Sequence, residues 1–238
     1  MDRNLFFPGA DLSHLAPIDG GSILGGKPKC LWHSTETKVL PSYSTGFFPN
    51  MTICKGTPFQ HIPANRAARA LKKRRGGVQT NRWNVFQIEI CGFANNIGLV
   101  GVMQEVADWL FEVRGTPKTC SVKFRQFDSS FGFNNGVRLS AEEWRTYAGH
   151  LGHMHAPEND HGDPGSPFPI DLILGGDDMT KDELLDALRS PTGQAILRDA
   201  VRHELRVATG KDDATQPAGA WFNEVKANVR AIKNKVAP

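Results

Sequence analysis

The chain has 238 residues, of which 39% are hydrophobic and 22% are charged, as in an ordinary globular protein. Its formal net charge of +3 is too small to predict binding to nucleic acid. No stretch approaches the roughly 20 apolar residues that cross a bilayer. Residues 1–15, MDRNLFFPGADLSHL, lack the apolar core of a secretory signal. We therefore expect a protein that is made in the cytoplasm and is not inserted into a membrane.

The first quarter of the chain predicts an extended segment, a buried strand and a hairpin. Residues 1–28 are rich in glycine and proline and are expected to form an N-terminal extension. KCLWHS, residues 29–34, predicts a short buried strand that carries His33 near its end. Residues 45–63 alternate short apolar runs with turn-forming residues, which predicts two strands joined at Lys55 and Gly56.

The middle of the chain predicts two helices on either side of a strand. Residues 64–75, ANRAARALKKRR, favour a helix by their alanine and leucine content, and Gly76 and Gly77 would end it. Its basic run, residues 72–75, is either a solvated helix end or a contact with an anionic polymer. Residues 84–94 predict a buried strand around a single acidic residue, Glu89. Residues 98–115 have the apolar spacing of an amphipathic helix.

Residues 139–153 predict a further helix, opened by a capping box of Ser140 and Glu143. Trp144 and Leu151 would lie on its apolar face, and His153 would follow in a loop rich in glycine and proline. Strands that alternate with helices indicate an α/β layer architecture.

The composition changes after about Leu174, and residues 175–238 predict an all-helical appendage. A second capping box, Thr180 with Glu183, opens it, and an apolar stripe that includes Trp221 lies on its last, basic helix. This tail could bind a polymer surface, join protomers or link to another domain.

The four cysteines are well separated and form no CxxC pair: Cys30, Cys54, Cys91 and Cys120. This pattern is not that of a disulfide framework or of a four-thiolate zinc site. We expect reduced, buried thiols.

Potential metal ligands are concentrated in GHMHAPENDHGDPG, residues 152–165, which holds three histidines, two aspartates and a glutamate. Catalytic zinc uses three protein ligands and keeps a fourth position open. His33, at the end of its strand, together with His153 and Asp163 from this loop, would supply three. Alone, His33 would be interpreted as a structural histidine, and His155 is an alternative to His153.

Three pieces, WHSTET, TNRWNVFQIEICGFA and GHMHAPENDHGDPG, occur in an order and spacing typical of one family. Over residues 28–171 the chain resembles the zinc-dependent N-acetylmuramoyl-L-alanine amidases (amidase type 2) of the peptidoglycan-recognition-protein-like fold. Among them it is most similar to endolysins of phages that infect actinobacteria. The resemblance implies a central mixed β-sheet flanked by helices, and a catalytic domain at residues 29–174.

The resemblance also implies roles for individual residues. His33, His153 and Asp163 match the three zinc ligands, the third of which is Asp or Cys in the family. Many members have a lysine two residues before that ligand to stabilise the oxyanion, and here His161 takes its place. Glu89 matches the strand carboxylate that acts on the attacking water. Some members use a tyrosine instead, but Tyr43 aligns poorly, so Glu89 is preferred.

The implied activity is hydrolysis of the amide between N-acetylmuramic acid and L-alanine of the stem peptide, which lyses bacteria. The implied partner is peptidoglycan, the expected state is a monomer, and a phage enzyme without a signal peptide would reach the cell wall through a holin. A bacterial recycling amidase would have a similar sequence. Two further alternatives are a non-catalytic peptidoglycan-binding module of the same fold and a metal-dependent stem-peptide peptidase.

Several polar residues near these motifs have more than one interpretation. His61 is expected to be structural or to line the groove, and Glu36 either orients a metal-binding histidine or caps a turn. Asn81 and Arg82 are candidates for the glycopeptide groove, where an arginine could pair with a stem-peptide carboxylate. The loop carboxylates are expected to hold turns of the loop in place: Glu158 and Asp160.

Overall fold

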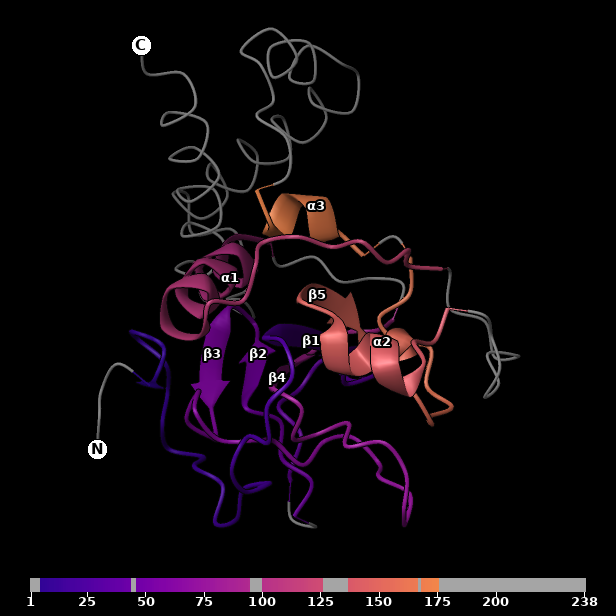
Figure 1. Ribbon diagram of the computed structural model, residues 1–238. Coiled ribbons are helices and arrows are strands. Elements are labelled where there is room, and N and C mark those ends of the chain that lie inside the picture. Colours follow the sequence, from indigo (N-terminus) through magenta and orange to yellow (C-terminus); the bar gives the residue numbers. More distant parts are fainter. Residues whose placement is uncertain (1–4, 44–45, 95–99, 126–136, 167, 176–238) are drawn as a thin grey trace, which may run out of the picture. The chain divides into compact units, whose positions relative to one another are not determined.

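The computed structural model describes residues 5–43, 46–94, 100–125, 137–166 and 168–175 (Figure 1). By its internal contacts the chain divides into two units, Met1–Leu174 and Gly175–Pro238. The helices expected after residue 175, with their capping box and apolar stripe, lie outside the described residues. The description below concerns the first unit.

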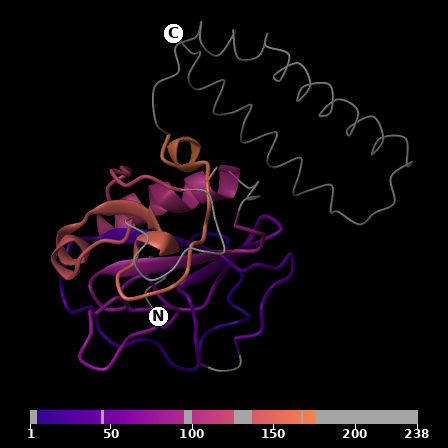
Figure 2. The same ribbon diagram turned by 90° about the vertical axis from the view of Figure 1, so that its right-hand side faces the viewer.

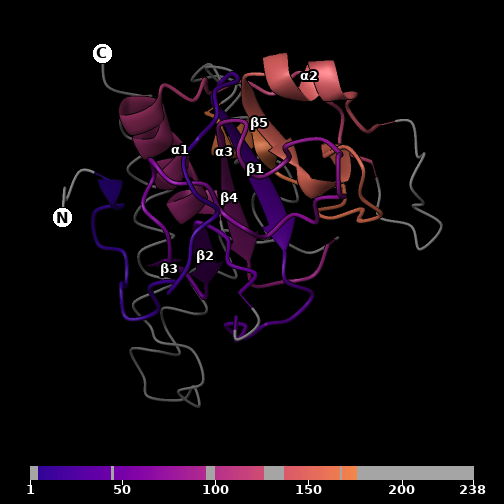
Figure 3. The ribbon, with the colours of Figure 1, turned by 60° about the horizontal axis from the view of Figure 1, so that its bottom comes forward.

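A mixed five-stranded sheet forms the centre of this unit, in the order β3-β2-β4-β1-β5 (Figure 3). Its strands are β1 (Lys29–Ser34), β2 (Met51–Cys54), β3 (Thr57–Gln60), β4 (Val85–Ile90) and β5 (Gly149–Gly152). β3 runs antiparallel to β2, and the other neighbours pair in parallel. The expected α/β class is thus confirmed, as are the strand at residues 29–34 and the hairpin at Lys55 and Gly56.

One face of the sheet is covered by the helix α1 (Val100–Arg114) and the short helix α3 (Ile170–Ile173), as Figure 2 shows. Trp32, Phe86 and Ile88 point to this side and pack with α1 residues that recur at helical spacing: Met103, Val106, Ala107 and Leu110. The amphipathic helix expected in this region is therefore confirmed. The apolar core that these residues form leaves the other face available for polar groups.

The opposite face carries the polar residues of the same strands, because alternate residues of a strand point to opposite sides. In the parallel register Leu31 pairs with Gln87, His33 with Glu89, and Thr52 with Glu89. Leu31 belongs to a smaller apolar cluster on this face, with members from β4, β5 and α2 (Ala141–Thr146): Val85, Leu151 and Trp144. Beyond that cluster the face becomes polar.

A fully buried lysine begins β1 on this polar face. The Lys29 ammonium donates to the carbonyls of Lys27, at 2.7 Å, and Trp83, at 2.8 Å. It also lies 5.6 Å from the centroid of the Trp144 ring. Burial, followed by the nearby Arg114 charge, lowers the pKa of Lys29 to about 7. The group therefore costs folding free energy while it is charged.

The helix expected at residues 64–75 is wrong, since this segment forms neither helix nor strand. Several of its backbone groups bond to segments that are distant in sequence. Ala64 N donates to the Leu5 carbonyl at 2.9 Å, and Ala67 exchanges bonds with Gly20 and Gly21. The N-terminal extension thus supplies the partners that a helix would have supplied itself, and long-range pairing overrides a local preference.

The helix expected at residues 139–153 is shorter than predicted. Its capping box is confirmed: Ser140 N donates to Glu143 Oε2 at 2.7 Å, and Glu143 N donates to Ser140 Oγ at 3.2 Å. The helix ends at Thr146, and Gly149, with φ +112°, begins β5. This φ is one that L side chains rarely adopt. Leu151 consequently lies in a strand beside Leu31, and not on a helical face.

The expectation of four reduced cysteines is also wrong, because Cys54 and Cys91 form a disulfide. Ile53 pairs with Ile90 in the parallel register of β2 and β4. Cys54 and Cys91, which follow these two residues in the sequence, therefore lie side by side. Sequence spacing could not show this proximity, which depends on strand pairing. Cys30 is a buried free thiol, as expected, and Cys120 is a half-buried one.

Among the described helices, none is both long and apolar enough to pass through a membrane.

Candidate metal centre

Strand β1 holds the first expected ligand rigidly. Every residue of β1 is buried, and His33 is only 1% exposed. Its imidazole emerges on the polar face, next to the Glu89 side chain of β4, and His33 Nδ1 lies 3.7 Å from Glu89 Oε1. Because both residues lie on paired strands, the sheet backbone sets their separation.

The loop that follows β5 folds back so that His153 and Asp163 meet. Met154 N donates to the Asp163 carbonyl at 2.9 Å, which closes the loop across its ends. Buried Asn159 holds the interior of the loop: its amide donates to the His153 carbonyl at 3.2 Å, and its carbonyl accepts from His161 N at 2.7 Å. This closure explains how two ligands ten positions apart share one site.

The three expected ligands converge. His33 Nδ1 lies 3.0 Å from His153 Nδ1, and His153 Nδ1 lies 3.1 Å from Asp163 Oδ1. One ligand atom from each of the three residues lies within 4.8 Å of the others. Ligands about 2.0 Å from a tetrahedral zinc ion are separated by roughly 3.3 Å. The buried group of His33, His153 and Asp163 could therefore hold a metal ion.

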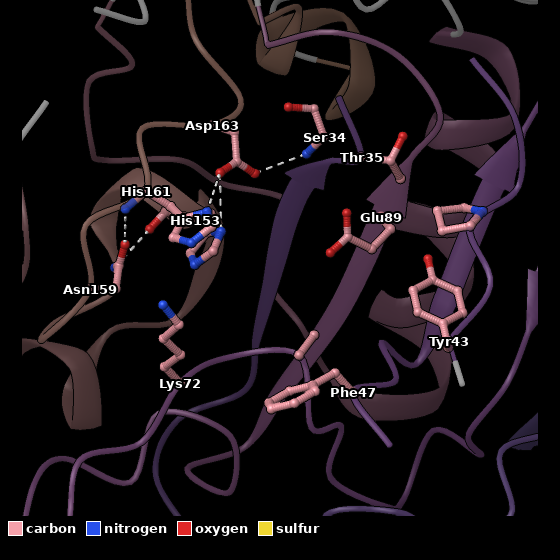
Figure 4. A pocket seen from close by; sticks show the side chains of 12 residues that line it. Ser34, Thr35, Tyr43, Phe47, Lys72, Glu89, His153, Asn159, His161 and Asp163 are labelled. Carbon is pink, nitrogen blue, oxygen red and sulfur yellow. Dashed lines mark hydrogen bonds and ion pairs between the residues drawn. The ribbon is translucent and has the colours of Figure 1, made fainter. Parts of the chain in front are cut away.

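Hydrogen bonds and charges tune the Asp163 carboxylate for this position. Its second oxygen, Oδ2, accepts from Ser34 N at 3.0 Å, which ties the loop to the end of β1 (Figure 4). Burial alone would raise the pKa of Asp163, but His153 and His161 outweigh it and hold that pKa well below its usual range. Burial, together with the neighbouring His153, lowers the pKa of His33 well below its usual range. A carboxylate beside a neutral imidazole suits a cation.

Glu89 faces this group from across the cavity, and in Figure 4 its carboxylate points toward His153 and Asp163. Its side chain is 16% exposed. Burial, followed by the charges of Asp163 and Glu36, raises the pKa of Glu89 to about 8. A carboxyl group with a pKa near neutrality, at the edge of a cavity, has the properties of a general acid or base.

His161 lies beside the three ligands and not among them. Its ring stacks on that of His153 with a centroid distance of 4.5 Å, and its Nδ1 lies 3.5 Å from Asp163 Oδ1. The side chain is half exposed and lines the cavity. The hydrogen bond with Asp163 is the largest influence on the pKa of His161, which is raised above its usual value. The charged form is thereby favoured.

The choice between His153 and His155 is made by hydrogen bonds. His155 Nδ1 accepts from Gly152 N at 2.9 Å, and His155 Nε2 lies 3.1 Å from the Lys123 carbonyl. Burial lowers the pKa of His155 to about 4. Both ring nitrogens of His155 are engaged with the backbone, so His153 is the histidine of this loop that reaches the group.

A cavity of about 380 Å³ opens over the group. Its lining includes Glu89, His153, His161 and Asp163. The other lining residues come from the loops around it: Ser34, Thr35, Pro41, Tyr43, Phe47, Ala70, Lys72 and Asn159. Two of the three converging residues, His153 and Asp163, thus face a cavity that could admit a ligand.

Tyr43, the alternative to Glu89 that was set aside in the sequence, also lines this cavity. Its hydroxyl lies 2.7 Å from Thr52 Oγ1, which in turn lies 2.9 Å from His61 Nε2. His61 Nδ1 lies 2.8 Å from the His14 carbonyl. His61 is therefore buried in a hydrogen-bonded chain outside the metal group, as its structural interpretation expected.

The remaining polar candidates hold turns or line a neighbouring cavity. Glu36 accepts from Ser34 Oγ at 2.6 Å, consistent with the turn-capping interpretation. Glu158 accepts from Val78 N at 2.9 Å. Asn81 and Arg82 line a separate cavity of about 410 Å³.

Two residues of the site were missed in the sequence. Asn159 carries the loop closure, and the only available signal was an asparagine amid potential ligands. Lys72 was assigned to a helix end, yet Figure 4 shows its ammonium directed toward His153 and His161. No local signal could place a residue of an irregular segment at this cavity.

Two imidazoles and a carboxylate, close together and buried, form a group that could hold a metal ion. A carboxyl group across the cavity and a cationic imidazole beside the ligands add the means to transfer protons and to stabilise an anion. Comparisons with protein-family models, with curated proteins and with solved structures found no match to this chain.

Proposed function

We propose that this protein is a zinc-dependent N-acetylmuramoyl-L-alanine amidase of the peptidoglycan-recognition-protein-like fold. The observation that carries the proposal is the convergence of His33, His153 and Asp163 beside a cavity that His153, Asp163 and Glu89 line. The order of the three sequence motifs supports it independently. The mixed five-stranded sheet with its helices is consistent with the fold that the resemblance implies.

The residues present fit zinc better than a hard cation. Two imidazole nitrogens and one carboxylate oxygen suit zinc, whereas magnesium and calcium prefer oxygen ligands alone. When bound, zinc would act as a Lewis acid that lowers the pKa of water toward ~7 and polarises a carbonyl. His33, His153 and Asp163 would hold it and leave one position open.

The chain's own residues would move the protons of the hydrolysis. Glu89 accepts a proton from water while the water oxygen attacks the lactyl carbonyl. It then gives this proton to the alanine nitrogen as the C–N bond breaks. The positive charge of a metal ion held by the three ligands would favour the ionised form of Glu89, which this step requires. His161, cationic beside Asp163, donates to the oxygen on which negative charge develops.

The products are a glycan strand that ends in a lactyl carboxylate and a stem peptide with a free N-terminal alanine. In this proposal the protein acts as a monomer on the bacterial wall in a lytic role, and a phage-encoded form would leave the cytoplasm through a holin. Peptidoglycan is the macromolecular partner.

Mass spectrometry of muropeptides from purified walls tests the proposal. Lactyl carboxylates on the glycan, formed with zinc and lost with a chelator, support it. Cleaved peptide bonds with intact lactyl–alanine links would instead show a stem-peptide peptidase. Wall binding without any cleavage would show a binding module. His33→Ala should abolish the cleavage, and a lytic activity unchanged in that variant would overturn the proposal.

A further inference from the structure

Two buried polar atoms without a hydrogen-bond partner face the same side of the sheet. They are His33 Nε2 and Gln87 Oε1. Gln87 is the register partner of Leu31, two positions before His33, so the two side chains are diagonal neighbours on adjacent strands. A long side chain can span such a diagonal. Since an unpaired buried polar atom is costly, the pair calls for an explanation.

The orientation of the Gln87 amide is determined by Asn81. Gln87 Nε2 donates to Asn81 Oδ1 at 2.9 Å. Asn81 itself cannot be turned round, because its Oδ1 accepts from Leu71 N at 3.1 Å and its Nδ2 donates to the Leu71 carbonyl at 2.7 Å. The nitrogen of the Gln87 amide is therefore committed to Asn81, and its carbonyl oxygen remains for His33.

The backbone of Gln87 is held as firmly as its side chain. Gln87 N donates to Asn50 Oδ1 at 2.9 Å, and Asn50 N donates to the Gln87 carbonyl at 2.9 Å. Gln87 and Asn50 are both fully buried. The carbonyl oxygen of the Gln87 side chain is thus a rigidly placed acceptor.

An acceptor at this place decides which nitrogen of His33 carries the proton. A neutral imidazole has one N–H and one lone pair. With an acceptor beside Nε2, the proton belongs on Nε2 and the lone pair on Nδ1. Nδ1 is the atom that lies 3.0 Å from His153 Nδ1 and 3.7 Å from Glu89 Oε1.

We propose that Gln87 is a positioning residue that holds His33 in its Nε2–H tautomer and directs the Nδ1 lone pair to the metal centre. The inference rests on the proposed metal-binding function of this group, which it deepens. Outer partners of this kind typically change metal affinity by about 10–100-fold. In this tautomer the His33 Nε2–H and the Gln87 Oε1 acceptor, both left without another partner, would satisfy each other.

The first test needs no variant. A long-range proton–nitrogen-15 correlation spectrum of the metal-free wild type distinguishes the two tautomers of a neutral histidine. We expect His33 to be protonated at Nε2, and the Nδ1–H tautomer would overturn the proposal. Because this spectrum requires no zinc, it decides the inference even if the wild type bound no metal, which would count against the proposed function alone.

The second test measures zinc affinity by competition with a chromophoric chelator. Gln87→Met keeps the length of the side chain and removes the acceptor, and it should weaken zinc binding by about 10–100-fold. Gln87→Glu retains an acceptor oxygen and should bind zinc more tightly than Gln87→Met does, with the Nε2–H tautomer preserved. Gln104→Met, on α1 at the other face of the sheet, is the matched control and should bind like the wild type.

Circular dichroism establishes that each variant is folded before its affinity is compared. A folded Gln87→Met protein that loses less than about fivefold in affinity would contradict the expected effect of an outer partner. A larger loss of zinc affinity in Gln87→Met, which neither the Gln104→Met control nor Gln87→Glu shares, would support the positioning role of Gln87.

Discussion

His33 and Glu89 are direct register partners on the adjacent parallel strands β1 and β4, and His33 Nδ1 lies 3.7 Å from Glu89 Oε1. The first proposed ligand and the proposed base are therefore fixed by the sheet and not by a loop. Sites built on strands hold their geometry more accurately than sites built on loops. The positions of His153, His161 and Asp163 depend instead on the closure of the loop that follows β5.

Removal of a ligand should remove the metal. We expect His33→Ala and Asp163→Ala each to weaken zinc binding by more than about 100-fold, beyond the effect of losing an outer partner. The physical reason is that two ligands cannot complete a tetrahedral site. Elemental analysis after dialysis against a weak chelator measures the retained zinc.

His14→Ala is the control for these ligand variants, since His14 is exposed. It should retain zinc like the wild type. Stoichiometric zinc in folded His33→Ala protein would show that the ion is held elsewhere.

Glu89→Gln should separate metal binding from catalysis. The amide keeps the size of the side chain but cannot accept a proton, so the rate of wall hydrolysis should fall by about 10²–10⁴-fold. Zinc content should be unchanged, because Glu89 is not one of the three converging ligands. Release of soluble muropeptides measures the rate.

Glu105→Gln, on the exposed side of α1, provides the matched control and should hydrolyse walls normally. Full activity of Glu89→Gln would transfer the role of base to another group that lines the cavity, such as Tyr43.

His161 should be replaceable by lysine but not by alanine. His161→Ala removes a donor beside the cavity and should lower kcat by about 10²–10³-fold with little change in KM. His161→Lys restores a cation and should recover most of that loss. Since the side chain is half exposed, both proteins should fold. Equal rates for the alanine variant and the wild type would remove His161 from the proposed mechanism.

The stability of the fold should rise with pH through the titration of Lys29. Its pKa is lowered by burial from the ordinary 10.5 to about 7. Between these two values the unfolded chain binds the proton and the folded chain releases it, so the free energy of unfolding increases with pH. The cost of burying the charge is complete below about pH 7 and absent above about pH 10.5.

Urea denaturation at pH 7 and pH 9 measures this effect. In the wild type the free energy of unfolding should rise with pH by roughly 1 kcal/mol per pH unit more than it does in Lys29→Met. Lys27→Met, at an exposed position, should keep the wild-type slope. Parallel pH profiles for the wild type and Lys29→Met would show that Lys29 remains charged in the folded protein.

The sequence by itself determined the elements whose signals are local. Strands at residues 29–34 and 85–90, the helix over residues 100–114 and the Ser140 capping box follow from periodicity and from side chains that bond to nearby backbone. The residue types of the metal group could also be recognised in the sequence, because one loop holds three histidines, two aspartates and a glutamate. Their pairing with a strand histidine came from the order of the motifs.

Only the tertiary structure decided which of these groups meet. Residues 64–75 do not form the expected helix, because the N-terminal extension forms hydrogen bonds with their backbone. Cys54 lies next to Cys91 because strands β2 and β4 pair in parallel register. His155 was turned away from the metal group by the backbone of Gly152 and Lys123. The N-terminal extension, Cys91 and Lys123 are distant in sequence from the residues that they contact, and a contact between distant residues leaves no periodic trace in either segment.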